Sequence, residues 1–301
     1  MRAASFYQPE SPRLRDGFLE PPLIIDSLGA LEMGVLSDGG RGVLSGRGLT
    51  AVHTSLPSRS FDLARRALAE WEQRFRRQPQ LIKILSADDI ERCSDQGKLG
   101  ILLGFQNPSC IDDNVDNLYR LYAAGARVIQ LSSESRNLPG NGCSEESAIG
   151  LSDFGVAAVE TMNELGMVVD FSRCKEETSR YGIQLSRKAP AFTHTSCGAL
   201  HDHPHAKSDE LLRTMAERGG VIGIHPGDHH SPEKHLDHVT HAVKIAGIDH
   251  VGIASFSGDW SPRSRVSFLA VARGLQRRGY RSKEIEKLIG GNWNRYLRQA
   301  I

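Results

Sequence analysis

The stretch GLSDFGVAAVETMNELGMVVDFS (150–172) predicts one helix followed directly by one buried strand. Ser152 is a typical N-cap residue, and Gly166 is typical of the position just past a helix C-terminus. The run after this glycine is apolar and contains β-branched residues, as expected of a strand buried on both faces. A helix that leads into such a strand is the repeating unit of an α/β protein with a parallel sheet.

The same alternation runs along the whole chain. Further helix-like segments lie at 60–75, 112–125 and 208–220, each with a capping residue at one end. Eight apolar runs are candidate strands, at 23–26, 49–56, 99–105, 126–132, 166–172, 190–196, 220–226 and 249–255. Eight strand–helix alternations in one chain predict a single (β/α)8 barrel. We expect this domain to cover residues 1–301, with the N-terminal segment 1–22 and C-terminal helices in 282–300 packed on the barrel.

Composition and charge argue against several classes of partner. The 37 basic and 36 acidic residues leave a formal charge of +1, so neither nucleic acid nor a membrane surface is an expected partner. No apolar run approaches the roughly 20 residues of a membrane span. The N-terminus lacks the apolar core of a secretory signal, and the five cysteines form no CxxC pair. These features favour a cytoplasmic protein with reduced thiols.

The active site of a (β/α)8 barrel lies at the C-terminal ends of its strands. The residues at or just after those ends are therefore the candidates for function. They are Asp26, His53, Gln106, Ser133, Glu134, Asp170, Arg173, His194, His225 and the segment 255–259, which ends in Asp259.

Several stretches resemble, in the right order, the membrane (renal) dipeptidases of peptidase family M19. They are GLSDFGVAAVETMNELGMVVDFS itself, THTSCGALHDHP (193–204), LLRTMAERGGVIGI (211–224), AGIDHVGIAS (246–255) and GLQRRGYRSKEIEKLIGGNWNRYL (274–297). The resemblance covers nearly the whole chain. It implies an amidohydrolase-like barrel that binds two zinc ions and commonly forms a homodimer.

The zinc ligands that this resemblance implies are mostly absent. The family's His-x-Asp, bridging Glu and two further His fall on Leu28, Ala30, Gln106, Arg173 and His194, of which only His194 matches. A guanidinium stays protonated and cannot donate an electron pair to a metal. Its charge would also repel two dications. We therefore expect a site without metal or other cofactor.

The positions that contact substrate in the family are changed as well. The His that holds the tetrahedral intermediate falls on Ser133, and the Arg that grips the substrate carboxylate falls on His205. The Asp that faces the substrate amine falls on Phe256, with Asp259 nearby. The resemblance thus implies the fold more directly than the reaction.

We interpret the remaining polar residues as a repurposed site for a small anionic substrate derived from an amino acid or dipeptide. His194 is the expected acid–base group, Arg173 the expected anion holder, and Asp170 either orients His194 or pairs with Arg173. Arg173 is also expected to compensate the charge of Asp170 and Asp26. Gln106 completes the catalytic set, and the substrate-binding set is Asp26, Ser133, Glu134, His205, His225 and Asp259. The expected chemistry is proton transfer by a lyase, isomerase or hydrolase in a specialised biosynthetic pathway.

Alternatives remain open from the sequence. The chain is a catalytically inactive binding protein if these polar groups are structural, and a zinc-dependent dipeptidase if the alignment is out of register. The His-rich region 201–241 invites a new metal site, with His238 and His241 three residues apart on an expected helix. Cys174 and Cys197 each follow a site residue and are candidate nucleophiles.

Overall fold

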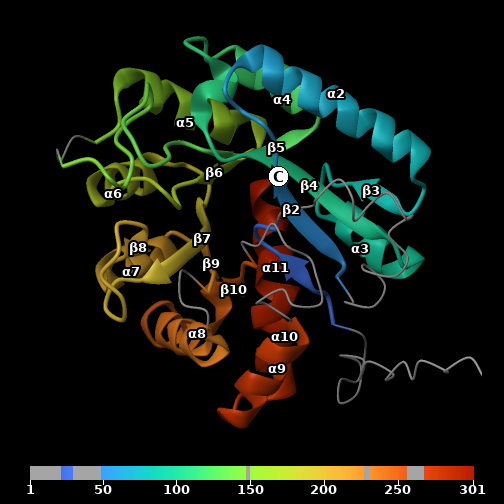
Figure 1. Ribbon diagram of the computed structural model, residues 1–301, viewed down its shortest axis with the longest axis vertical. Coiled ribbons are helices and arrows are strands. Elements are labelled where there is room, and N and C mark those ends of the chain that lie inside the picture. The colour runs from blue at the N-terminus through green and yellow to red at the C-terminus, as the bar shows by residue number, and fades with distance from the viewer. Residues whose placement is uncertain (1–21, 30–48, 147–149, 227–230, 256–267) are drawn as a thin grey trace, which may run out of the picture.

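Eight parallel strands form the centre of the protein. The computed structural model describes residues 22–29, 49–146, 150–226, 231–255 and 268–301. In sheet order the strands are β1 (Ile25–Asp26), β2 (Ala51–Ser55), β4 (Leu99–Phe105), β5 (Ala126–Gln130), β6 (Val168–Asp170), β7 (Ala191–Cys197), β9 (Val221–Ile224) and β10 (Val251–Ile253). The backbone N–H of Ser27 donates to the carbonyl of Ile253 at 3.1 Å, which brings β1 beside β10. The result is the predicted (β/α)8 barrel, nearly closed (Figure 1).

Helices surround the strands (Figure 1). They are α2 (Phe61–Arg77), α3 (Asp88–Gln96), α4 (Asn117–Ala123), α5 (Asp153–Leu165), α6 (Glu176–Leu185), α7 (Asp209–Glu217), α8 (Pro232–Ala246), α9 (Phe268–Arg277), α10 (Ser282–Glu286) and α11 (Asn292–Ala300). The predicted N-caps are confirmed, because the hydroxyls of Ser60, Ser152 and Ser208 accept backbone N–H groups of the first turn. Gly166 ends α5 in the left-handed conformation that glycine adopts freely.

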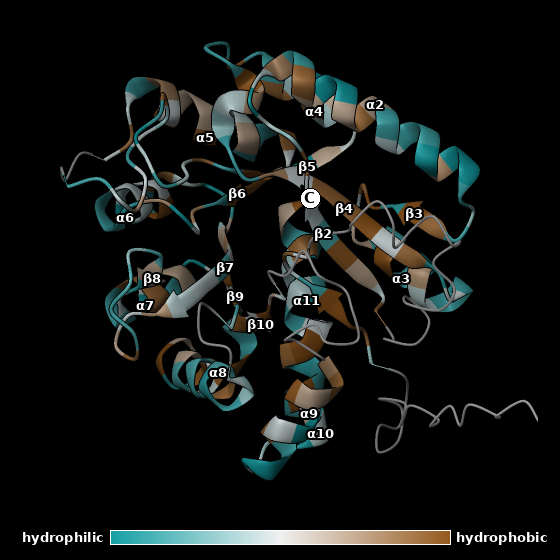
Figure 2. Cartoon of the chain, in the orientation of Figure 1, coloured by the Kyte–Doolittle hydropathy of each residue, from teal (hydrophilic) through white to brown (hydrophobic). Residues whose placement is uncertain are grey.

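The apolar side chains form two cores. Along β4, Ile101, Leu103 and Phe105 belong to the outer core between strands and helices, whereas Leu102 belongs to the inner core. This alternation follows from the two-residue period of a strand. Figure 2 shows the strands mostly apolar and the helices with polar bands toward solvent, so both faces of the sheet are covered.

Helix α11 fills one end of the barrel. Trp293 and Tyr296 join the inner core together with the first residues of several strands, among them Val168, Ala191 and Val221. Gly252 allows this contact, because a Cβ there would lie 2.3 Å from Trp293 Nε1. The strand N-termini are thus closed by the C-terminal helix, and the opposite end is left for the site.

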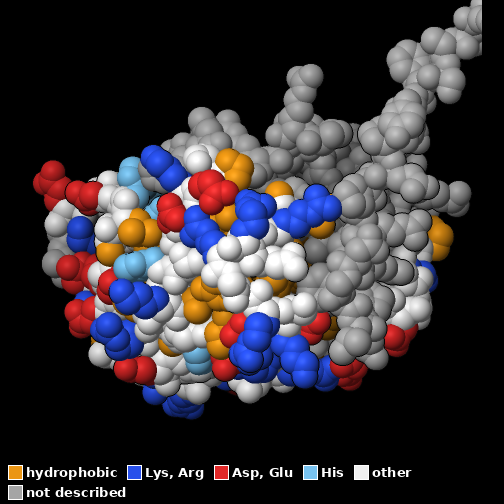
Figure 3. All heavy atoms as spheres, turned by 90° about the horizontal axis from the view of Figure 1, so that it is seen from below, with side chains coloured by type: hydrophobic (Ala, Val, Ile, Leu, Met, Phe, Trp, Pro, Cys, Tyr) orange, Lys and Arg blue, Asp and Glu red, His pale blue; other side chains and the backbone are white. Residues whose placement is uncertain are grey.

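The surface carries both signs of charge. On the face in Figure 3, Lys and Arg side chains lie among Asp and Glu side chains. None of the helices in the described part of the chain combines the length and apolarity that a membrane span needs.

Candidate functional site

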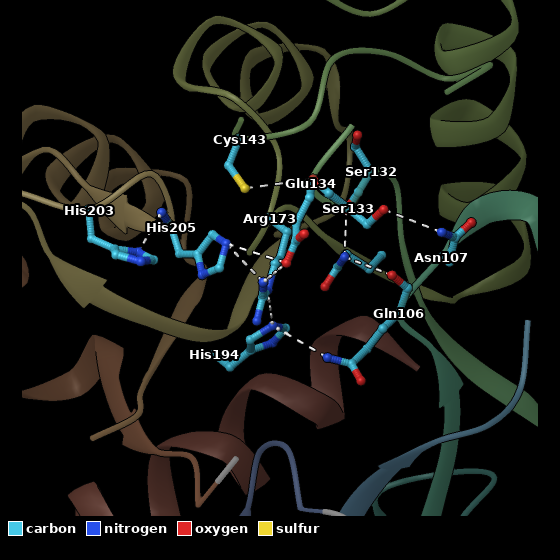
Figure 4. A network of polar contacts seen from close by, with 11 residues as sticks. Gln106, Asn107, Ser132, Ser133, Glu134, Cys143, Arg173, His194, His203 and His205 are labelled. Atoms are coloured by element: carbon cyan, nitrogen blue, oxygen red, sulfur yellow. Dashed lines mark hydrogen bonds and ion pairs between the residues drawn. The ribbon is translucent and has the colours of Figure 1, made fainter. Parts of the chain in front are cut away.

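Three side chains, one from a strand and two from loops that follow other strands, meet at the C-terminal mouth of the barrel (Figure 4). His194 lies in β7, Arg173 in the loop after β6, and Gln106 directly after β4. Arg173 Nε donates to His194 Nε2 at 3.4 Å, and Gln106 Nε2 lies 3.5 Å from the same atom. The structure therefore brings together Gln106, Arg173 and His194, the three residues that the sequence predicts for the catalytic set beside Asp170.

A chain of hydrogen bonds fixes the tautomer of His194. Thr193 Oγ1 donates to Asp170 Oδ2 at 2.6 Å, because a carboxylate can only accept. With its one proton used there, Thr193 Oγ1 accepts from His194 Nδ1 at 2.9 Å. The proton on Nδ1 leaves a lone pair on Nε2, which faces the donors of Arg173 and Gln106. Asp170 thus orients His194, as one of the two predicted roles requires, but through Thr193.

The surroundings keep His194 neutral. Burial lowers its pKa well below 6.5, and the nearby His225 and Arg173 lower that pKa further. His225 has its ring centroid 6.1 Å from that of His194, and burial lowers the pKa of His225 to about 3. At neutral pH the imidazoles of His194 and His225 are therefore uncharged and lie near the permanent cation of Arg173.

The outer edge of the site is formed by Glu134 and His205. Arg173 Nη1 donates to Glu134 Oε1 at 3.0 Å and to His205 Nε2 at 2.9 Å. The Arg173 side chain is only 14% exposed, whereas that of Glu134 is 63% exposed. Ser133 precedes Glu134 in the same loop, and its hydroxyl accepts from Asn107 Nδ2 at 3.3 Å. These predicted substrate-binding residues thus lie at the mouth.

Asp26 is the last residue of β1 and is fully buried. Its Oδ1 accepts from the backbone N–H groups of Leu28 at 3.2 Å and Ser255 at 2.9 Å. Burial raises the pKa of Asp26 to about 6. These contacts tie the end of β1 to the end of β10, and the role of Asp26 in substrate binding stays a prediction.

The compensation of Asp170 and Asp26 by the charge of Arg173 stays a prediction, and the hydrogen bonds of Asp170 come from nearby groups. Asp170 Oδ1 accepts from the backbone N–H groups of Ser172 at 2.9 Å and Thr193 at 3.1 Å, so local donors stabilise this carboxylate. Arg173 forms an ion pair with Glu134. The predicted positions Phe256 and Asp259 lie outside the described residues.

The donor set does not fit a dinuclear zinc site. Of the three converging groups, the imidazole of His194 is of a type that binds zinc, and the amide of Gln106 binds it poorly. The guanidinium of Arg173 has no lone pair to give. Arg173 Nε also points at the imidazole nitrogen that would have to bind a metal. Within the described ranges, no group of three or more His, Cys, Asp or Glu side chains is arranged to hold a metal ion.

The His-rich region shows separate contacts. His238 Nδ1 accepts from the backbone N–H of Cys197 at 3.1 Å, while His241 Nε2 pairs with Asp209 Oδ1 at 2.7 Å. The spacing that suggested chelation is thus used for two different structural contacts. His229 and His230 fall outside the described residues.

The cysteines do not have the environment of nucleophiles. Cys174 and Cys197 are buried, and this burial raises the pKa of each thiol to about 12. A thiolate is the reactive form of cysteine, so neither residue supports the predicted alternative of a Cys nucleophile at neutral pH.

Two residues beside the site were missed from the sequence. Thr193 precedes His194 on the strand, and neighbours in a regular strand point to opposite faces. The β7–β9 pairing shifts register between Phe192 and Thr195, which accounts for Thr193 and His194 sharing one network. Lys207 is buried in β8 (Ala206–Lys207), and its Nζ donates to the carbonyl of Cys174, next to Arg173. No sequence motif indicates that Thr193 would connect Asp170 to His194, or that Lys207 would hold the loop beside Arg173.

Comparison with known proteins identifies the family. Residues 47–301 match the sequence profile described as membrane dipeptidase (peptidase family M19). The chain is 32% identical to Dipeptidase verJ of Clonostachys rogersoniana over 209 residues, which are 65% of this chain and 54% of that protein. It spans about half the length of such relatives.

Solved structures show the same architecture. An amidohydrolase from Pseudomonas aeruginosa has a TM-score of 0.83 and 26% identity, with 93% of this chain and 96% of that chain covered. The probable dipeptidase PvdM from the same organism, at 22% identity over 93% of this chain and 95% of that chain, has a TM-score of 0.78 and supports the fold. The match over most of the sequence shows that the chain belongs to the membrane dipeptidase family, peptidase family M19.

Proposed function

We propose that this dipeptidase-like barrel is an enzyme that works without a metal at the mouth of the barrel, on a small anionic substrate derived from an amino acid or dipeptide. One observation carries the proposal: the Nε of Arg173 faces the Nε2 of His194. A fixed positive charge then stands where the resemblance to the family implies zinc ligands. A buried guanidinium can bind a carboxylate with two parallel hydrogen bonds.

His194 is the proposed acid–base group. Its neutral form holds a proton on Nδ1 and a lone pair on Nε2, so Nε2 can take a proton from a substrate and return it later. Gln106 Nε2 and Arg173 Nε, which lie at the same nitrogen, would position the reacting group beside it. Proton abstraction and return suit a lyase, an isomerase or a hydrolase.

An anionic substrate would itself prepare His194 for this role. The positive charge of Arg173 is one of the causes that lower the pKa of His194. Glu134, whose carboxylate already pairs with Arg173, is largely exposed to solvent. A substrate carboxylate enclosed in the site would offset that charge more fully than Glu134 does and raise the pKa of His194 toward the working pH, where a general base is most effective. Binding and proton transfer are therefore coupled through one guanidinium.

A catalytically inactive binding protein is the second candidate. It is favoured by the loss of the family's ligand types at Gln106 and Arg173, and it would use the same site to hold a small anion without turnover. A zinc-dependent dipeptidase is disfavoured by the donor chemistry of Arg173. We further propose a homodimer in the cytoplasm that serves a specialised biosynthetic pathway; the family relationship supports this by analogy only.

Activity on a panel of dipeptides and N-acyl amino acids distinguishes the metal-independent enzyme, the binding protein and the zinc-dependent dipeptidase. The proposal predicts turnover that a chelator leaves unchanged and that His194→Gln abolishes. Turnover that a chelator removes would identify a zinc dipeptidase. Binding of panel members without turnover by the folded protein would identify a binding protein.

A further inference from the structure

The two partners of the ion pair between Arg173 and Glu134 differ in their exposure to solvent. The guanidinium is anchored on the inner side by the contact of Nε with His194, while Nη1 contacts both His205 and Glu134 at the outer edge. The carboxylate of Glu134 sits on the outer side and is largely exposed to solvent. Its contacts within the described residues are Arg173 at 3.0 Å and His205 at 3.8 Å.

The backbone around Glu134 is held independently of this pair. The carbonyl of Glu134 accepts from the N–H of Ser144 at 2.9 Å, and the carbonyl of Ser133 accepts from the N–H of Cys143 at 3.2 Å. The side chain can therefore swing away from Arg173 while the loop keeps its place. An exposed side chain on a fixed backbone is free to sample several rotamers.

We infer that the carboxylate of Glu134 occupies the place on Arg173 that the carboxylate of the substrate takes, and that substrate binding displaces it. The inference rests on the proposed function and adds a specificity-determining residue to it. A ligand must offer Arg173 a better partner than Glu134 does. Planar carboxylates that can engage the guanidinium with both oxygens meet this condition, whereas neutral ligands leave the ion pair intact.

The competition is mild, because the carboxylate of Glu134 is largely exposed and water screens its attraction to Arg173. Removing a pair of this kind should tighten the binding of a carboxylate by up to about fivefold, the equivalent of about 1 kcal/mol. Glu134 thus keeps the buried cation paired when no ligand is bound, at a small cost in affinity.

Acetate is the probe for this competition, and its dissociation constant is measured by NMR titration at constant ionic strength. Glu134→Gln should bind acetate more tightly than the wild type. Glu134→Asp should do so too, because the shortened side chain keeps its charge but no longer reaches Arg173. Glu146→Gln is the matched control, since Glu146 is an exposed acid in the same loop, and it should leave acetate binding unchanged.

Three results with the Glu variants overturn the inference. One is weaker acetate binding by Glu134→Gln, which would make Glu134 a ligand contact. Another is unchanged binding by Glu134→Gln or Glu134→Asp, and the third is an equal gain in Glu146→Gln, which would indicate general charge repulsion. Loss of acetate binding in Arg173→Met, with the Glu134 variants unchanged, would reject this inference while keeping the proposed anion site. Equal acetate binding by Arg173→Met and the wild type would reject both.

Discussion

Arg173 Nε lies 3.4 Å from Nε2 of His194, and both residues are held in place by further hydrogen bonds. This contact joins a permanent cation to the imidazole atom that is best placed for chemistry. It also sets the electrostatics of the site, because the guanidinium disfavours protonation of the ring.

Removal of the guanidinium should raise the pKa of His194. Arg173→Met deletes one of the positive neighbours that lower this pKa, but leaves burial, which is the larger cause. The pKa should therefore rise and still stay below 6.5. NMR titration of the His194 ring in the variant and the wild type measures the change; an unchanged or lower pKa would show that the two groups do not interact.

Loss of the Thr193 hydroxyl should remove the hydrogen bond that orients His194. Thr193→Val leaves Asp170 Oδ2 and His194 Nδ1 without their shared partner, which should cost about 1–3 kcal/mol of stability. Nitrogen NMR of the ring should show that Nδ1 keeps its proton but loses its hydrogen bond, because Nε2 still faces the N–H of Arg173, and turnover should fall. Thr195→Val is the control on the same strand, because the Thr195 hydroxyl contacts the carbonyls of Ser196 and His205. An unchanged Nδ1 resonance in Thr193→Val would disprove the relay from Asp170.

Mild acid should destabilise the protein. Burial lowers the pKa of His225 to about 3 and that of His235 to about 4, so the unfolded chain binds protons more readily than the folded one. The stability from keeping these rings neutral is present above pH 6.5 and is lost as pH falls from about 6.5 toward 4, by about 3 kcal/mol for each ring.

Urea denaturation at several pH values measures this loss. His235→Gln should flatten the profile, because the amide can still donate to the carbonyl of Ile224 as His235 Nε2 does at 3.0 Å. Stability that stays constant from pH 7 to pH 4.5 would mean that the imidazoles are accessible to protons in the folded state.

A side chain at Gly104 should disturb the barrel wall beneath the site. A Cβ there would lie 2.4 Å from His53 Nε2 and 2.7 Å from the carbonyl oxygen of Val128. Gly104→Ala should therefore destabilise the protein by about 1–3 kcal/mol. In Gly150→Ala the new Cβ meets Tyr181 at an ordinary 3.6 Å, so this variant should be close to wild type. Equal stability of the two variants in thermal unfolding would mean that His53 does not pack against Gly104.

The strands of the barrel were predictable because each forms a continuous apolar run. All eight expected runs contain an observed strand, and the (β/α)8 fold is confirmed. The short strands β3 (Leu81–Lys83) and β8 were missed. Two or three residues carry no periodic signal, and pairing with β4 and β7 decides their conformation.

The site was predictable only where the barrel itself places a residue. Gln106 and Arg173 follow the ends of β4 and β6, His194 lies within β7, and the parallel strands bring these positions together. The partner of Arg173 depends on the path of the loop that carries Glu134, which has no regular pattern. Asp26 ends a strand as well, but its carboxylate accepts the backbone N–H groups of Leu28 and Ser255. No residue spacing in the sequence reveals these contacts.

Metal content tests most directly whether protein charge has replaced the metal at this site. The protein is purified without chelator, dialysed against zinc and then against buffer, and its bound zinc is measured by mass spectrometry. If Arg173 holds the position beside His194, the protein retains no zinc at this site, and Arg173→Met does not change that result. Retention of about two zinc ions per chain, as in a dinuclear hydrolase site, would contradict the account.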